Sequence, residues 1–144
     1  MEQTIILNWE GPFRINEHIP KHLIGAVGIY LFECDSSVVY VGKAETQGAF
    51  KRLKDHFRGN MDQTGKCVMA YLGNANKDKI NIWIAWIEQE KDALLIGDAE
   101  KLVIFNRNPL CNRTNREKYD GKPLHIKNLG NRPKELPEEI HSHI

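Results

Sequence analysis

The stretch AVGIYLFECDSSVVYVG, residues 26–42, decides the fold of this chain. It holds two runs rich in β-branched and aromatic residues, 26–33 and 38–41, separated by the polar tetrapeptide CDSS. Two such runs joined by a short polar gap are typical of an antiparallel hairpin. The sequence therefore predicts a hairpin here, with Tyr30 in one strand and Tyr40 in the other, where the two rings could approach each other.

After the hairpin, the hydrophobic pattern alternates between helical and extended segments. Residues 48–58 carry apolar side chains at helical spacing, which predicts an amphipathic helix. Residues 80–87, INIWIAWI, are apolar at nearly every position, which predicts a strand covered on both faces. Residues 90–106 carry the longest helical pattern. The order predicts an α/β (α+β) fold, in which α-helices flank a small central antiparallel sheet of about three strands.

Weaker signals lie outside this core. Short strands are expected at 4–7, 68–72 and 123–126, and a final helical turn is expected at 135–141. The length of 144 residues fits one domain. We therefore expect a single domain over 1–144, with a core at about 26–113 and extensions at both ends.

Composition limits the class and compartment of the protein. The chain is 41% hydrophobic and 27% charged, unlike a disordered or fibrous protein. Its longest apolar run, residues 82–87, is far shorter than the roughly 20 residues of a membrane span, and no signal peptide pattern is visible. The three cysteines, Cys34, Cys67 and Cys111, form no C-x-x-C pair and are odd in number, so neither a disulfide framework nor a zinc knuckle is expected. These features favour a cytoplasmic protein without membrane contact.

Basic residues concentrate in two segments of an almost neutral chain. There are 20 Lys+Arg against 19 Asp+Glu, for a net charge of +1. Residues 43–58 hold five basic and two acidic residues, and residues 101–118 hold five basic and one acidic residue. This segregation can form a basic face for nucleic-acid phosphates, although charge runs are also common on ordinary solvated surfaces.

Glu100 is the first candidate for chemistry, because it lies within the apolar pattern of the long helix. Its same-face neighbours are Ile96, Val103 and Ile104. An ionised carboxylate in such surroundings needs a cation or a hydrogen-bond donor. A divalent metal bound by one carboxylate, waters and a phosphate would meet that need. An ordinary ion pair with an arginine would meet it too.

Polar groups suited to phosphate chemistry lie on the short helix and the hairpin. Arg52 and His56 are four residues apart, so they share one face of the predicted helix. A guanidinium can bind a phosphate through two oxygens, and an imidazole can accept a proton near neutral pH. Tyr30 and Tyr40 add two phenols, and Lys43 adds a nearby cation. Each group also has an ordinary interpretation, as a surface pair or as core tyrosines.

The order of these residues resembles that of the GIY-YIG nuclease family. The tripeptide at 28–30 matches the first family motif letter for letter, and the tripeptide YVG at 40–42 differs from the second only by valine for isoleucine. Arg52 with His56, then Glu100, then Asn112 follow in the family's order. The resemblance covers roughly residues 26–113.

The resemblance implies a metal-dependent DNA endonuclease that hydrolyses phosphodiester bonds by in-line attack of water. It implies one divalent metal, Mg2+ or Mn2+, with Glu100 as the only protein ligand and Asn112 tying its loop to the active site. DNA would be the partner. Because the length leaves no room for a separate DNA-reading domain, binding could also involve a homodimer or a protein partner. The alternative is a non-cleaving nucleic-acid-binding or regulatory module on the same fold.

The same resemblance gives roles to the remaining candidates. Tyr30 or His56 would be the general base, and the residue types leave open which of the two it is. Tyr40 would support the base or contact the phosphate. Arg52 would bind the substrate phosphate, and Lys43, by its own charge and its place just after the second motif, would add positive charge there.

Overall fold

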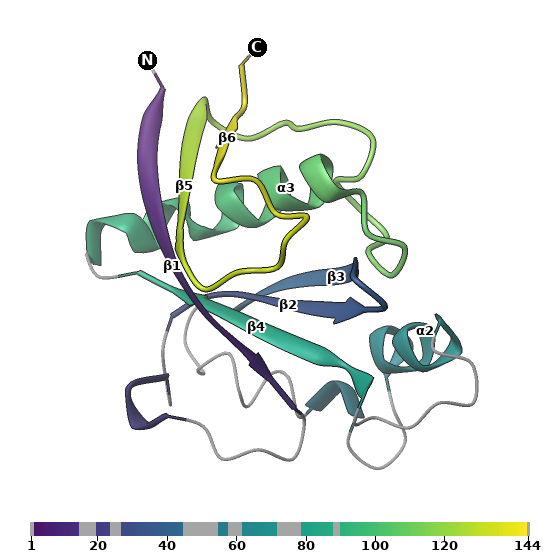
Figure 1. Cartoon of the computed structure of the whole chain (residues 1–144). Coiled ribbons are helices and arrows are strands. Elements are labelled where there is room, and N and C mark those ends of the chain that lie inside the picture. The colour runs from purple at the N-terminus through teal and green to yellow at the C-terminus, as the bar shows by residue number, and fades with distance from the viewer. Residues whose placement is uncertain are drawn as a thin grey trace.

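The predicted hairpin forms one edge of a larger sheet. It consists of β2, Gly28–Cys34, and β3, Ser37–Ala44, which pair antiparallel. The sheet has six strands in the order β3-β2-β4-β1-β5-β6 (Figure 1). The structure is a computed structural model, and it describes residues 2–14, 20–23, 27–44, 55–57, 62–71, 79–87 and 90–143.

The expected sheet of about three strands is too small, because the terminal extensions add three more strands. The expected part is β3-β2-β4, with β4 at Asn81–Trp86 buried on both faces as predicted. Strand β1, Gln3–Phe13, pairs antiparallel with β4 and parallel with β5, Leu124–Gly130. Strand β6, Glu139–His141, completes the other edge. The sheet is therefore mixed, and both extensions are integral parts of it.

Two of the weaker expectations about local structure are wrong. Residues 68–72 were expected to be extended, but helix α2 spans Gln63–Tyr71. The expected helical turn at 135–141 is instead irregular chain leading into β6. Short apolar runs fit both the helical and the strand periodicity of hydrophobic residues. Tertiary pairing therefore decides between helix and strand at such positions.

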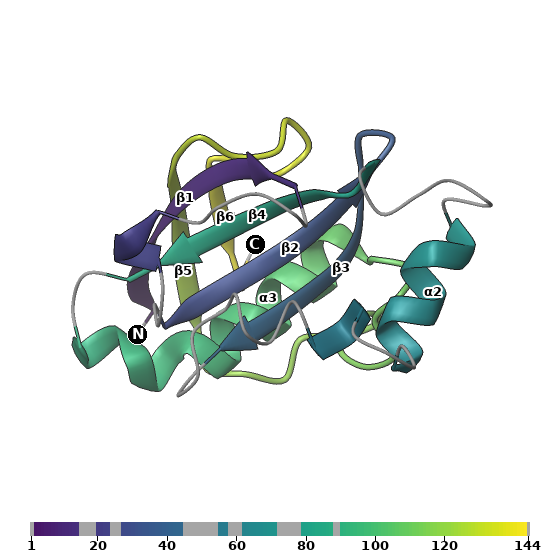
Figure 2. The same cartoon turned by 90° about the horizontal axis from the view of Figure 1, so that it is seen from below.

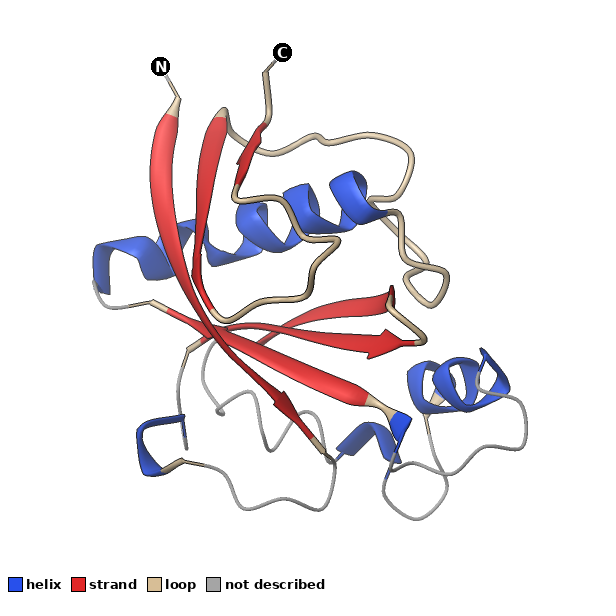
Figure 3. Cartoon of the chain, in the orientation of Figure 1, coloured by secondary structure: helices blue, strands red, loops and turns tan. Residues whose placement is uncertain are grey.

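The helices lie on the faces and beside the edge of the sheet. The predicted long helix is the 3-10 segment η3, Glu90–Leu95, followed by α3, Ile96–Arg107, which crosses one face of the sheet (Figures 2 and 3). A short 3-10 turn, η1, spans Lys21–Leu23. Of the helix expected at 48–58, the structure describes residues 55–57, which are helical. No helix within the described ranges is long and apolar enough to cross a membrane.

Apolar side chains fill both sides of the sheet, as the patterns of alternation require. On the α3 side, strands β1 and β5 contribute buried residues such as Ile5 and Ile126, and α3 contributes Leu102 and Val103. A second cluster on the other face includes Tyr30, Phe32, Ile82, Phe57 and Val68. The hairpin strand β2 is buried along its whole length because it faces both clusters.

A disulfide joins two of the three cysteines. Cys67 of α2 and Cys111, which follows α3, are bonded, with their Cα atoms 5.7 Å apart. The expectation of no disulfide is therefore wrong, because neither an odd count nor a missing C-x-x-C pair bears on cysteines 44 residues apart that the fold brings together. Cys34 is the unpaired thiol, buried in β2.

A thiol titration tests this arrangement. At about pH 8 the native protein is expected to show no reactive thiol, because burial, with the charges of Asp35 and Glu33, raises the pKa of Cys34 to about 11. The reactive thiolate therefore forms only as the pH rises towards that value. Denaturation should expose one thiol, and denaturation with a reductant should expose three. Cys34→Ala should abolish the single thiol that denaturation alone exposes. Reactive thiols in the native Cys34→Ala variant would contradict the disulfide.

Candidate active site

The two motif tyrosines meet on one face of the hairpin. Tyr30 pairs across the strands with Gly42, and Tyr40 pairs with Phe32. The ring centroids of Tyr30 and Tyr40 are 6.1 Å apart, so the rings do approach each other. Their surroundings differ, however: Tyr30 is 1% exposed, whereas Tyr40 is half-buried and lines a cavity.

Both motif glycines are required by close approaches of the backbone. A Cβ on Gly28 would lie 1.8 Å from the carbonyl oxygen of Ala85 in β4. A Cβ on Gly42 would lie 2.3 Å from Cζ of Tyr30, whose ring rests on the β3 backbone at this point. The glycine in each tripeptide thus lets the neighbouring strand or ring come into place, which explains the sequence pattern physically.

A chain of hydrogen bonds leads from Tyr30 to Asp62. The hydroxyl of Tyr30 lies 2.8 Å from Nε2 of His56, and Nδ1 of His56 lies 2.7 Å from a carboxylate oxygen of Asp62. Tyr30 and His56 are buried, and the Asp62 side chain is 49% exposed. With Asp62 ionised, Nδ1 carries the proton, and Nε2 is left to accept the hydrogen bond from Tyr30.

Asp62 was not predicted as a site residue, although its position just before a helix can be recognised from sequence. Its second carboxylate oxygen accepts a hydrogen bond from the Gly65 amide at 2.8 Å, and its carbonyl accepts one from the Lys66 amide. This is the geometry of an aspartate N-cap at the start of α2. An aspartate just before a helix can be recognised from sequence, but its contact with His56 depends on the fold.

Glu100, Tyr40 and Asn112 line one cavity at the outer edge of β3. The cavity has a volume of about 540 Å³ and lies between α2 and α3. Glu100 is half-buried, and its neighbours Ile96, Val103 and Ile104 are buried. The remaining lining residues come from β3, α2, α3 and the loop after α3: Val41, Gln63, Thr64, Lys66, Cys67, Ile104, Leu110, Cys111, Arg113, Thr114 and Asn115.

Asn112 binds β3 as an additional strand would. Its side-chain oxygen accepts the amide hydrogen of Val41 at 2.9 Å, and its side-chain nitrogen donates to the carbonyl of Val41 at 2.9 Å. The amide of Cys111 donates to the carbonyl of Val39 at 2.8 Å. The loop that carries Asn112 is therefore fixed to the middle of the YVG motif.

The predicted cations are distributed unevenly around this site. Lys43 lies on the α3 side of β3, where its ammonium would be 3.5 Å from a Cβ placed on Gly97, one helical turn before Glu100. Arg52 lies outside the described residues. Two basic residues that were not predicted, Lys66 and Arg113, line the cavity itself. Of these, Arg113 belongs to the basic segment 101–118 seen in the sequence.

The donors around the cavity suit a hard divalent cation. Glu100 is the one carboxylate among the described lining residues, and Tyr40 and Thr64 supply neutral oxygen atoms. Magnesium is commonly bound by one or two carboxylates together with waters and substrate phosphates. One half-buried carboxylate facing an open, polar cavity fits that pattern.

Comparison with known proteins places this arrangement in a family. The family model described as the GIY-YIG catalytic domain matches residues 26–120, which is more than half of the chain. No curated protein and no solved structure shows a significant match. The matched segment contains both glycine–tyrosine motifs, His56, Asp62, Glu100 and Asn112. The chain is therefore a member of the GIY-YIG nuclease family.

Proposed function

We propose that the chain is a metal-dependent DNA endonuclease that hydrolyses phosphodiester bonds by in-line attack of water. One observation carries the proposal: Glu100, Tyr40 and Asn112 line a single cavity, and the hydrogen-bonded chain from Tyr30 to Asp62 packs directly behind Tyr40, whose ring centroid lies 5.4 Å from that of His56. Membership in a nuclease family supports the same conclusion.

Glu100 would hold the metal, for which Mg2+ or Mn2+ is expected. When bound, the ion supplies Lewis-acid stabilisation of the phosphate and of the departing 3′ oxygen. Tyr40 would donate its hydroxyl hydrogen to a non-bridging oxygen. Lys66 and Arg113, with Arg52 and Lys43, would add fixed positive charge around the phosphate.

Tyr30 and His56 would remove the proton of the attacking water. Because Tyr30 is buried and does not line the cavity, it would take this proton through one bridging water, while its own hydroxyl proton passes to Nε2 of His56, 2.8 Å away. Asp62 would act as a positioning residue, because it fixes the tautomer in which Nε2 is free to accept. Tyr40 is the alternative base, since it is the phenol that faces the cavity.

Nicking of supercoiled plasmid DNA tests the proposal. The purified chain should nick plasmid in the presence of Mg2+ or Mn2+, and a chelator should stop the reaction. Branched and single-stranded DNA tested in parallel would define the preferred substrate. Salt-sensitive DNA binding without metal-dependent cleavage would instead support the non-cleaving module.

Asp62→Asn is expected to slow cleavage about 10- to 100-fold with little loss of stability. Asparagine still caps a helix, so α2 should form. Its amide nitrogen, however, can donate to Nδ1 of His56 and so favour the tautomer that cannot accept from Tyr30. A wrong tautomer costs about 10,000-fold in a fully buried serine-protease triad, and the half-exposed Asp62 should matter less.

The measurements for this variant are the cleavage rate as a function of pH and the melting temperature. Asp62→Ala, which also loses the cap, should melt lower by an amount that corresponds to about 1 kcal/mol. Wild-type cleavage by Asp62→Asn over the whole pH range would exclude the positioning role.

A further inference from the structure

A second polar cluster lies on the outer face of the sheet, at the edge opposite the cavity. Strand register creates it: His125 of β5 pairs with Thr4 of β1 on one side and with His141 of β6 on the other. Glu2 lies two residues before Thr4, and Glu139 lies two residues before His141. Both glutamates therefore share the face of this row. The alternate residues of β5, Leu124 and Ile126, are buried on the α3 side.

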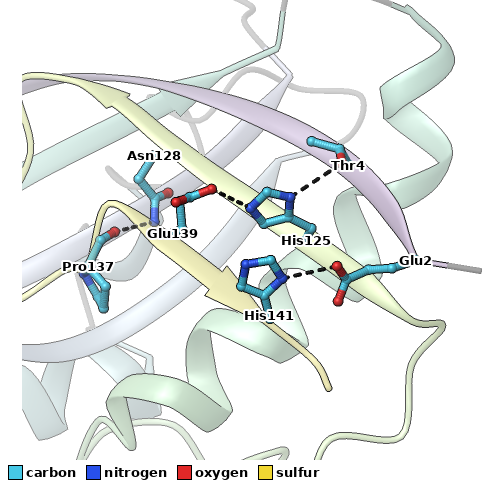
Figure 4. A network of polar contacts seen from close by, with 7 residues as sticks. All are labelled: Glu2, Thr4, His125, Asn128, Pro137, Glu139 and His141. Atoms are coloured by element: carbon cyan, nitrogen blue, oxygen red, sulfur yellow. Dashed lines mark hydrogen bonds and ion pairs between the residues drawn. The ribbon is translucent and has the colours of Figure 1, made fainter. Parts of the chain in front are cut away.

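The side chains of this cluster contact one another closely (Figure 4). The imidazole rings of His125 and His141 stack, with centroids 3.9 Å apart and planes inclined by 9°. Nδ1 of His141 lies 3.0 Å from Oε1 of Glu2, and Nε2 of His125 lies 2.7 Å from Oε1 of Glu139. Nδ1 of His125 lies 3.4 Å from the hydroxyl of Thr4.

We propose that Glu2, His125 and His141 form a binding site for a zinc-type transition-metal ion. Two imidazoles and one carboxylate are ligands that zinc prefers, and a water can complete four-coordination. One potential ligand atom from each residue lies within 4.8 Å of the others. Two nitrogens on one tetrahedral zinc ion are separated by about 3.3 Å. Closing the cluster therefore requires only that half-buried and exposed side chains turn by a small amount.

Glu139 prepares His125 for this role. A metal-bound histidine commonly donates its other ring N–H to a carboxylate, which fixes the tautomer and makes the ligand nitrogen more basic. Because Nε2 of His125 donates to Glu139, Nδ1 keeps a lone pair on the side of Thr4. The cluster thus contains both the ligands and a second carboxylate in the supporting position.

Charge on this face also favours a cation. Lys127 lies two residues after His125 and pairs in register with Glu139. Among the described residues of this row, the two carboxylates of Glu2 and Glu139 stand against this one ammonium, so with neutral imidazoles their charges sum to minus one. A bound ion would join the first, fifth and sixth strands of the sheet. The site is separate from the cavity at β3, and its existence does not rest on the proposed function.

Zinc titration of the tag-free full chain tests the proposal. Isothermal titration calorimetry at about pH 7.5 should show one site with a dissociation constant in the micromolar range or below. Zinc at about 100 times that constant should raise the melting temperature by about 5–10 °C. His141→Gln and Glu2→Gln should each weaken binding at least about 30-fold, and their melting temperatures without zinc should match the wild type.

A matched variant separates this site from other zinc contacts. His143→Gln alters a histidine beside the cluster and should bind zinc as the wild type does. A wild-type dissociation constant near 1 mM would overturn the proposal. Binding unaffected by His141→Gln and Glu2→Gln would overturn it too.

Discussion

Glu100→Gln should lower metal-dependent DNA cleavage by about a thousandfold or more. The substitution keeps the size of the side chain but removes the one carboxylate among the described lining residues of the cavity. Loss of a single preorganised group that stabilises transition-state charge already costs about 100- to 1000-fold. If Glu100 holds the metal as proposed, its loss should cost at least as much. Stability should change little, because glutamine has the same size and its side-chain oxygen can still accept hydrogen bonds.

The measurement is a time course of plasmid nicking across a range of Mg2+ and Mn2+ concentrations. Glu117→Gln, in the exposed basic loop after α3, is the matched control and should cleave normally. If Glu100→Gln cleaves as fast as the wild type at every metal concentration, Glu100 does not bind the catalytic metal.

Tyr30→Phe should reduce cleavage by about 100- to 10,000-fold, the range typical of a lost general base. Phenylalanine keeps the ring that packs against Gly42, so the hairpin should still form. The missing hydroxyl leaves Nε2 of the buried His56 without its partner among the described side chains. An unsatisfied buried polar atom costs about 1–3 kcal/mol, so the melting temperature should also fall.

Tyr40→Phe separates the two phenols. Tyr40 faces the cavity, and in the proposed mechanism it contacts the phosphate, so its loss should cost about tenfold, less than the loss of Tyr30. The cleavage rates of Tyr40→Phe and Tyr30→Phe are compared as a function of pH. Their melting temperatures show whether each variant is folded under the assay conditions. A larger loss in Tyr40→Phe than in Tyr30→Phe would identify Tyr40 as the base.

The centre of the fold could be predicted because its signals are local. Strands β2, β3 and β4 have continuous β-branched and aromatic runs, and α3 has a long helical pattern. The motif glycines mark the places where a strand and a ring pack against backbone, so the spacing of Tyr30 and Tyr40 already indicated their proximity. Glu100 could be singled out as a candidate for a similar reason, because a carboxylate within an apolar helical pattern is unusual.

The remainder depends on contacts between distant segments. Strands β1 and β5 extend well beyond the short strands expected at 4–7 and 123–126, and β6 has three residues that are held by pairing with β5. The pairing of Cys67 with Cys111, and of Asp62 with His56, requires α2 to lie beside β3. No pattern within 59–78 indicated that position.

The loop that carries Asn112 has a consequence for self-association. An uncovered edge strand invites another chain to extend the sheet. Here the outward-facing backbone groups in the middle of β3 already have partners. The carbonyl of Val39 accepts from the Cys111 amide, and the Asn112 side chain binds both the N–H and the carbonyl of Val41. At the opposite edge, β6 offers only three residues. Among the described strands, neither edge therefore offers a long uncovered row of backbone groups to another copy of the chain.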